Sequence, residues 1–235
     1  MVKDTVRRIV LVGVSFALLA SASLASVSDV ERSPSETGPS SAGAFNRWLF
    51  SVHPHNTGVK ARAYARFQTY LESKGVAGIV PTWQLWRVDA YYARRCETEF
   101  FAIPPTESWS EIVPVLQLIR DEVIPEVGPV EVVSGYRTPA INACVNGAAR
   151  SKHLSFSALD LVALEMTQRQ RLFRQLCELQ SRVGQRRAMG LGAYFDPDDL
   201  ERGRRGRFHI DASGFRTWGF DYTGRSNPCP RLTAE

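Results

Sequence analysis

Two histidines and one aspartate have surroundings that favour metal binding. His153 comes seven residues before Asp160, a spacing that suits one ligand on a loop and another on the strand which that loop enters. Asp160 lies between the apolar residues Leu159 and Leu161. A carboxylate in a buried strand is costly unless it is paired or bound to a metal. We therefore expect Asp160 to be a metal ligand or a member of a tight ion pair.

His209 is the third candidate ligand. It lies in an alternating run whose odd positions share one face of a strand, so Arg207, His209 and Asp211 project together. Two histidines and one aspartate leave a fourth position for water, which is typical of a catalytic zinc site rather than a structural one. The remaining histidines, His53 and His55, stand in a segment without periodicity and are interpreted as part of a solvated loop.

Short helices and strands must position these residues. Helical periodicity predicts a helix that is capped by Ser110 and carries Pro114 in its first turn, and a second helix that is capped by Thr167 and ended by Gly184. Alternating and β-branched runs predict four strands, over residues 129–134, 156–163, 191–195 and 207–212. Because these elements alternate irregularly and have short links, we expect an α+β fold, a small antiparallel sheet with flanking helices.

The first 25 residues have the order of a secretory signal peptide: a basic start, an apolar run and a small, polar end. The apolar run has 12 residues, fewer than the roughly 20 that span a bilayer. We expect cleavage; an uncleaved anchor, the alternative, would be the protein's link to the membrane. Residues 26–44 are rich in Ser, Pro and Gly and predict a flexible linker. Residues 45–102 carry aromatic side chains at helical spacing and predict a helical N-terminal subdomain.

The chain has 235 residues, of which 44% are apolar and 23% charged, a globular composition that excludes a disordered protein. The formal charge of +5 falls to about +3 without residues 1–25, and together with export this argues against a nucleic-acid partner. Export to an oxidising compartment allows up to two disulfides among the four cysteines, in any of three pairings. Cys177, within a predicted helix, is alternatively a buried thiol. The cysteines are Cys96, Cys144, Cys177 and Cys229.

Two motifs follow one another in an order typical of one enzyme family. The first consists of Ser134-Gly-Tyr-Arg137-Thr-Pro139, then Asn142, Gly147, Ser151-x-His153 and Asp160. The second consists of His209-Ile-Asp211, then Gly214, Arg216 and Trp218. The first resembles the zinc D-Ala-D-Ala carboxypeptidase family, whose relatives include VanX-type dipeptidases. The second is similar to the closing motif of the periplasmic murein endopeptidases. The resemblance covers about residues 103–220, so we interpret 103–235 as a zinc D,D-peptidase-like catalytic domain.

The resemblance implies a site and a reaction. His153, Asp160 and His209 would bind one Zn²⁺ per chain, Arg137 would meet a carbonyl or terminal carboxylate of the substrate, and Ser151 would lie beside the substrate. The expected activity is hydrolysis of amide bonds in peptidoglycan stem peptides or cross-links, of the carboxypeptidase or the endopeptidase type. The expected location is the bacterial periplasm or cell envelope.

The sequence departs from the family pattern near both histidine ligands. Relatives commonly have Gly three residues after the first histidine; here Phe156 either narrows a pocket or fills the core. The glutamate that VanX-like enzymes have three residues before the last histidine is replaced by Gly206. Asp211 is therefore the candidate general base; alternatively it accepts a hydrogen bond from a ligating histidine ring.

Two other functions are compatible with these residues. The first is a catalytically inactive, zinc-stabilised cell-wall binding module. The second is a cell-wall anchoring protein without metal, which would require Asp160 to pair with an arginine instead.

Overall fold

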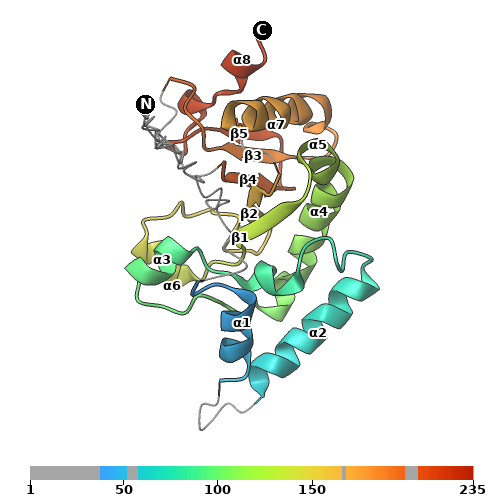
Figure 1. The fold of residues 1–235 in the computed structure, drawn as a ribbon, viewed down its shortest axis with the longest axis vertical. Helices are drawn as coiled ribbons and strands as arrows, with labels where there is room; N and C mark the ends of the chain where they lie inside the picture. The colour runs from blue at the N-terminus through green and yellow to red at the C-terminus, as the bar shows by residue number, and fades with distance from the viewer. Residues whose placement is uncertain (1–37, 52–57, 166–167, 199–205, 235) are drawn as a thin grey trace, which may run out of the picture. The chain divides into compact units, whose positions relative to one another are not determined.

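The computed structural model describes residues 38–51, 58–165, 168–198 and 206–234 (Figure 1). Within them no helix is both long enough and apolar enough to cross a membrane. The predicted signal peptide lies outside these residues, as do Thr167, His53 and His55. The α-helices are α1 (Ala42–Leu49), α2 (Val59–Ser73), α3 (Ala90–Arg95), α4 (Trp109–Leu118), α5 (Ile124–Val127), α6 (Pro139–Cys144), α7 (Arg169–Val183) and α8 (Cys229–Leu232). Four short 3-10 or π turns accompany them: η1 (Thr82–Trp86), η2 (Thr106–Ser108), η3 (Ile119–Val123) and η4 (Gly224–Ser226).

One five-stranded sheet carries the fold. The strands are β1 (Val130–Ser134), β2 (Ala158–Ala163), β3 (Gly190–Ala193), β4 (Phe208–Asp211) and β5 (Arg216–Trp218), in the spatial order β1-β2-β4-β3-β5. The α+β class is confirmed, but the sheet is mixed and not antiparallel as predicted, because β5 runs parallel to β3. The chain reverses after β4, and β3 is antiparallel to β4 as well, so β3 and β5 have the same direction. The three-residue β5 is too short to show an alternating pattern in the sequence.

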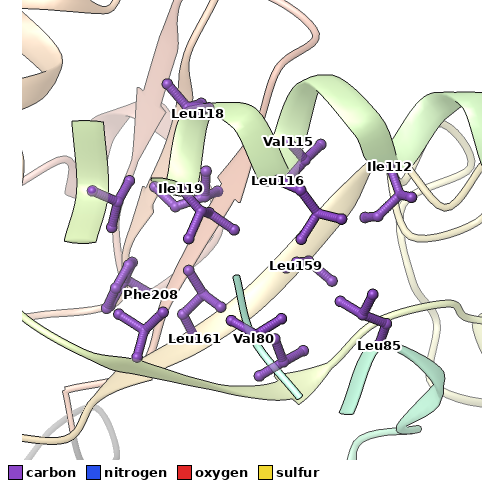
Figure 2. Packing of buried hydrophobic residues seen from close by; sticks show 14 of the residues in the cluster. Val80, Leu85, Ile112, Val115, Leu116, Leu118, Ile119, Leu159, Leu161 and Phe208 are labelled. Atoms are coloured by element: carbon purple, nitrogen blue, oxygen red, sulfur yellow. The ribbon is translucent and has the colours of Figure 1, made fainter. Parts of the chain in front are cut away.

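Strand alternation separates the core from the candidate site. Leu159 and Leu161 of β2 and Phe208 of β4 pack beneath α4, against Leu116 and Ile119, as Figure 2 shows. Helices α4, α5 and α7 lie together on this side (Figure 1). Because successive side chains point to opposite faces, the residues between these apolar positions must point away from the helices.

The first of the two predicted helices begins earlier than expected. The 3-10 turn η2 leads directly into α4, which starts at Trp109 with Ser108 at its N-cap position, so Ser110 is not the cap. Pro114 consequently lies in the interior of α4 and not in its first turn. The second predicted helix is confirmed as α7, which ends before Gly184. Its N-cap position is Gln168 and not Thr167 as predicted, because the helix starts at Arg169.

Residues 45–102 share one hydrophobic core with the sheet. Trp86 is fully buried among aromatic rings of α1 and α2, and the Phe67 ring lies 5.9 Å from the ring of Phe156. Phe156 is itself fully buried, so its bulk fills core. Its φ of 56° lies in the left-handed region, which glycine adopts without cost and other residues rarely adopt. Helix α1, capped by Ser41, starts inside the range 26–44 predicted as linker.

A buried ion pair attaches the same segment to the free edge of β1. Arg87 Nη1 donates to Glu131 Oε1 at 2.6 Å and to the carbonyl of Val132 at 2.6 Å, and both charged side chains are 1% exposed. Gln84 Oε1 accepts from the backbone N–H of Val132 at 3.0 Å. These bonds satisfy backbone groups of an edge strand that would otherwise lack partners.

All four cysteines form disulfides. Cys96 after α3 pairs with Cys144 at the end of α6, and Cys177 of α7 pairs with Cys229 of α8. Cys177 is therefore not the buried thiol considered above.

Candidate metal centre

His153, Asp160 and His209 come together from one loop and two adjacent strands. His153 lies in the turn before β2, Asp160 lies in β2, and His209 lies opposite Asp160 in the register of β4. One ligand atom from each lies within 4.8 Å of the others, and all three residues are buried. Both strand residues occupy the face opposite the helices, as their alternation with Leu159 and Phe208 requires.

The donor atoms lie at distances close to those between ligands of one zinc ion, with one oxygen of Asp160 facing each histidine. His153 Nε2 lies 3.2 Å from His209 Nδ1, His209 Nδ1 lies 3.1 Å from Asp160 Oδ1, and His153 Nε2 lies 3.3 Å from Asp160 Oδ2. Zinc bonds of about 2.0–2.1 Å place tetrahedral ligand atoms roughly 3.3 Å apart. Two imidazoles and one carboxylate are also a donor set that zinc prefers. The residues present therefore fit the ion that the sequence predicts.

The main chain fixes the orientation of His153. Its Nδ1 lies 2.7 Å from the carbonyl oxygen of Gly135, which can only accept, so Nδ1 carries the proton and Nε2 presents its lone pair to the cluster. The carbonyl of His153 in turn accepts from the N–H of Arg137 at 3.0 Å. The Ser134–Pro139 motif and the histidine loop thus hold each other in place.

Asp211 lies at the opposite ring nitrogen of His209 from the cluster. Its Oδ2 is 3.1 Å from His209 Nε2 and accepts from Arg216 Nη2 at 2.6 Å, while Oδ1 accepts from the N–H of Ser213 at 2.9 Å. The carboxylate is fully buried. Both of its oxygens are already engaged by these partners. This geometry fits the hydrogen-bond acceptor considered in the sequence analysis better than it fits the general base.

Asp160 contacts both candidate histidine ligands and also an arginine. Its Oδ2 accepts from Arg207 Nη2, while Oδ1 remains directed at His209. The pairing with arginine that a metal-free protein would require is therefore present, but it engages one oxygen and leaves the other within the histidine cluster.

Burial and neighbouring charges shift the pKa values of this cluster. Burial lowers the pKa of His153. Burial opposes the charged form of His209 too, but its bonds with Asp160 and Asp211 raise the pKa above the usual value. For Asp160, the Arg207 guanidinium and the two histidines overcome burial and hold the pKa well below its usual range. Asp211 has a lowered pKa for a similar reason, since His209 and Arg216 outweigh its burial.

Arg137 and Ser151 flank the histidine loop. The Arg137 guanidinium lies 5.0 Å from the centre of the Tyr92 ring, and its Nη1 lies 3.4 Å from Asn142 Oδ1. Its Nε is buried and has no hydrogen-bond partner in the described part of the chain. Ser151 is half-buried two residues before His153, and its N–H bonds to the carbonyl of Ala148 at 3.0 Å.

The sequence analysis missed two glycines that make room for the site. A Cβ at Gly190 would lie 2.7 Å from Asp211 Cγ, and one at Gly192 would lie 2.9 Å from His209 Cβ and from Trp218 Nε1. Both glycines belong to β3 and pair in register with Asp211 and His209. The available signal was partial, because Gly192 falls within the strand predicted over residues 191–195 but Gly190 comes just before it. Glycine in a strand often marks a close approach. Asp89, which contacts Arg207, gave no such signal.

This fold and this donor set define an α+β protein with a His-Asp-His group able to hold a metal. Residues 93–192 match the family model of Peptidase M15. The match confirms the resemblance to the zinc D-Ala-D-Ala carboxypeptidases and their VanX-like relatives. It contains Arg137, His153 and Asp160; His209 lies beyond it and reaches the same site through the pairing of β4 with β2. Neither a curated protein nor a solved structure is significantly similar to the chain.

The match and the cluster together support a zinc-dependent peptidase. Peptidases of this family are typically zinc enzymes, and the described residues bring the His-Asp-His group together.

Proposed function

We propose that the protein is an exported zinc peptidase that hydrolyses amide bonds in peptidoglycan stem peptides or cross-links. The observation that carries the proposal is the cluster of His153, Asp160 and His209, within and beside the region that matches Peptidase M15: the two ring nitrogens lie 3.2 Å apart, and each faces one oxygen of Asp160 at 3.1–3.3 Å. A zinc ion bound there supplies Lewis-acid chemistry: it acidifies a bound water and polarises a carbonyl.

Arg137 is proposed to bind the substrate. Its planar guanidinium suits a carboxylate or a carbonyl that gains negative charge, and its Nε offers a buried donor. The backbone bond between Arg137 and His153 keeps this donor in a fixed relation to the metal site. Ser151, in the same loop, is proposed to lie along the substrate.

Asp211 is proposed to orient His209. As a carboxylate it accepts a hydrogen bond from the Nε2–H group of His209, which leaves the lone pair of Nδ1 for the ion. Arg216 and the Ser213 N–H stabilise its charge. Transfer of a proton from water to the leaving amine would need an unoccupied carboxylate oxygen near the substrate, and Asp211 offers none.

Export is proposed on two grounds. Residues 1–25 have the order of a signal peptide, and the two disulfides are of a kind that persists in oxidising compartments. Peptidoglycan, whose stem peptides and cross-links contain amide bonds, is the polymer that an exported enzyme of this family would meet.

The test is digestion of defined muropeptides by the purified mature protein, followed by mass spectrometry. A monomeric pentapeptide ending in D-Ala-D-Ala tests the carboxypeptidase type, and a cross-linked dimer tests the endopeptidase type. We expect one of them to be cleaved, and cleavage to be lost with chelator and restored by zinc. Arg137→Ala should retain zinc and lose at least tenfold in kcat/KM. Zinc binding without cleavage of either substrate would instead support the inactive binding module.

A further inference from the structure

Arg207 lies between two buried carboxylates that are far apart in the sequence. Its Nη2 donates to Asp160 Oδ2, and its Nη1 donates to Asp89 Oδ2. Asp160 is 1% exposed and Asp89 is 6% exposed. Asp89 precedes α3 and stands before the first residue of the Peptidase M15 match. A continuous series of contacts therefore leads from a proposed metal ligand into the N-terminal segment.

The other two proposed ligands are each held by one outer hydrogen-bond partner. The Gly135 carbonyl holds His153, and Asp211, itself paired with Arg216, holds His209. Asp160 has Arg207 in the equivalent place, and Arg207 is paired with Asp89. An aspartate–arginine pair thus supports two of the three ligands. Such outer partners fix the orientation of a ligand and commonly affect metal affinity strongly.

Charge balance gives Asp89 a specific role in this arrangement. A lone guanidinium beside Asp160 would repel a divalent cation and compete with it for the carboxylate. The carboxylate of Asp89 offsets that charge and draws Arg207 onto Asp160 Oδ2 only. Asp160 Oδ1, which lies 3.1 Å from His209 Nδ1, then remains available to the ion.

We propose that Asp89 and Arg207 are positioning residues of the zinc site, and that the segment preceding the matched region is part of the catalytic unit through them. The inference rests on the proposed function, because it assumes that the cluster binds zinc. It assigns a role to residues 45–102, which the family resemblance did not cover.

Asp89→Asn separates the proposed role of Asp89 at the zinc site from its role as the cap of α3. Asp89 Oδ1 accepts from the N–H groups of Tyr91 and Tyr92 at 2.8 and 3.0 Å and so caps α3. Asparagine caps a helix as well as aspartate does. Its amide NH₂ cannot accept a hydrogen bond from Arg207. The substitution therefore keeps the cap and removes the contact that the proposal needs.

Two further variants complete the design. Arg207→Met removes the guanidinium, and Arg207→Lys keeps the charge but reaches one carboxylate at most. Glu131→Gln is the matched control, since Glu131 also forms a buried pair with an arginine of the N-terminal segment, Arg87. If Asp89 acted only by attaching the segment to the sheet, Glu131→Gln would have the same effect on zinc.

The measurement is zinc affinity by competition with a chromophoric chelator, together with the visible spectrum of the cobalt(II)-loaded protein and the melting temperature without metal. We expect Asp89→Asn and Arg207→Met to bind zinc about 10–100-fold more weakly with an altered cobalt spectrum, and Arg207→Lys to be intermediate. Glu131→Gln should melt lower but bind zinc within about twofold of the wild type. Unchanged or tighter zinc binding by Asp89→Asn or Arg207→Met, or an equal loss in Glu131→Gln, would overturn the inference. Absence of stoichiometric zinc in the wild type would overturn the proposed function instead.

Discussion

The imidazole of His209 joins Asp160 and Asp211 through its two nitrogens. Nδ1 lies 3.1 Å from Asp160 Oδ1, and Nε2 lies 3.1 Å from Asp211 Oδ2. Only one nitrogen can keep a lone pair for a metal, and the buried carboxylate of Asp211 selects Nδ1 by accepting a hydrogen bond from the Nε2–H group. The tautomer of a proposed ligand is thereby determined two residues away on the same strand.

Asp211→Asn tests this relationship. The amide can still contact His209, but it has no charge to hold the ring proton and leaves Arg216 without its ionic partner. We expect zinc affinity to fall about 10–100-fold while the secondary structure, followed by circular dichroism, is retained. Glu126→Gln, at a surface pair with Arg182, is the control and should bind zinc as the wild type does. Wild-type affinity in Asp211→Asn would contradict the positioning role.

Gly190→Ala should disturb the same carboxylate from the neighbouring strand. The added Cβ would lie 2.7 Å from Asp211 Cγ, so either the carboxylate or β3 must move. We expect weaker zinc binding, by tenfold or more, together with a lower melting temperature. Gly43→Ala is a suitable comparison, because its Cβ would meet only Arg47 Nη1 at 3.6 Å, and it should change neither property for the worse. Equal zinc affinity in both variants would show that β3 does not restrict Asp211.

Phe156→Gly separates backbone strain from core packing. Glycine relieves a left-handed conformation that costs other residues roughly 1–2 kcal/mol, but loss of a buried phenylalanine typically costs about 3–5 kcal/mol. We expect a net loss of about 1–4 kcal/mol in the free energy of unfolding, measured with urea. The loss includes the contact of Phe156 with the Phe67 ring. A stabilised variant would contradict the assignment of Phe156 to the core.

Acid should destabilise the zinc-free protein in a defined range. The pKa values of Asp160 and Asp211 are lowered in the folded state, whereas carboxyl groups of the unfolded chain protonate near pH 4. Below that pH the unfolded state binds more protons, so their stabilisation is complete above about pH 4 and is lost as the pH falls towards the folded pKa values. Melting temperatures measured between pH 6 and pH 3 should therefore decline less steeply in Asp211→Asn. An equally steep decline would show that Asp211 is not ionised in the native protein.

The two disulfides should contribute similarly to stability. They join residues 48 and 52 positions apart, and loops of that length correspond to about 4 kcal/mol each by the chain-entropy argument. We expect the double substitutions Cys96→Ser/Cys144→Ser and Cys177→Ser/Cys229→Ser to lower the free energy of unfolding by comparable amounts. Chemical denaturation under oxidising conditions measures both, and unchanged stability in either would mean that the pair is not bonded.

The sequence predicted the three candidate metal ligands better than the residues that hold those ligands in place. His153, Asp160 and His209 were recognisable because all three lie in the two motifs and because Asp160 is, in addition, an acid within an apolar strand. Asp89 could not be predicted, since its partner Arg207 is 118 residues away and only the folded chain brings them together. Arg216 was visible as a motif residue, but its contact with Asp211 depends on the parallel placement of β5.

The main strands of the fold were predicted from the sequence, but the shorter elements were not. Strands with strict alternation were found to within about two residues, because one face is buried against helices. The three-residue β5 and the early start of α4 were missed, since neither has a local pattern that differs from a loop or a turn. Packing of residues 45–102 on the domain that follows was predicted, and the shared core agrees with it. The particular contacts, such as that between Phe67 and Phe156, were not predictable because they are long-range.

The most direct test of the proposed zinc peptidase is the zinc content of the purified mature protein, measured by atomic emission. The variants His153→Ala and His55→Ala are measured beside it, and peptide release from peptidoglycan is assayed in the same preparations. We expect about one zinc per chain and peptide release in the wild type and in His55→Ala, and loss of both in His153→Ala. Full zinc content and activity in His153→Ala, or no zinc in the wild type, would contradict it.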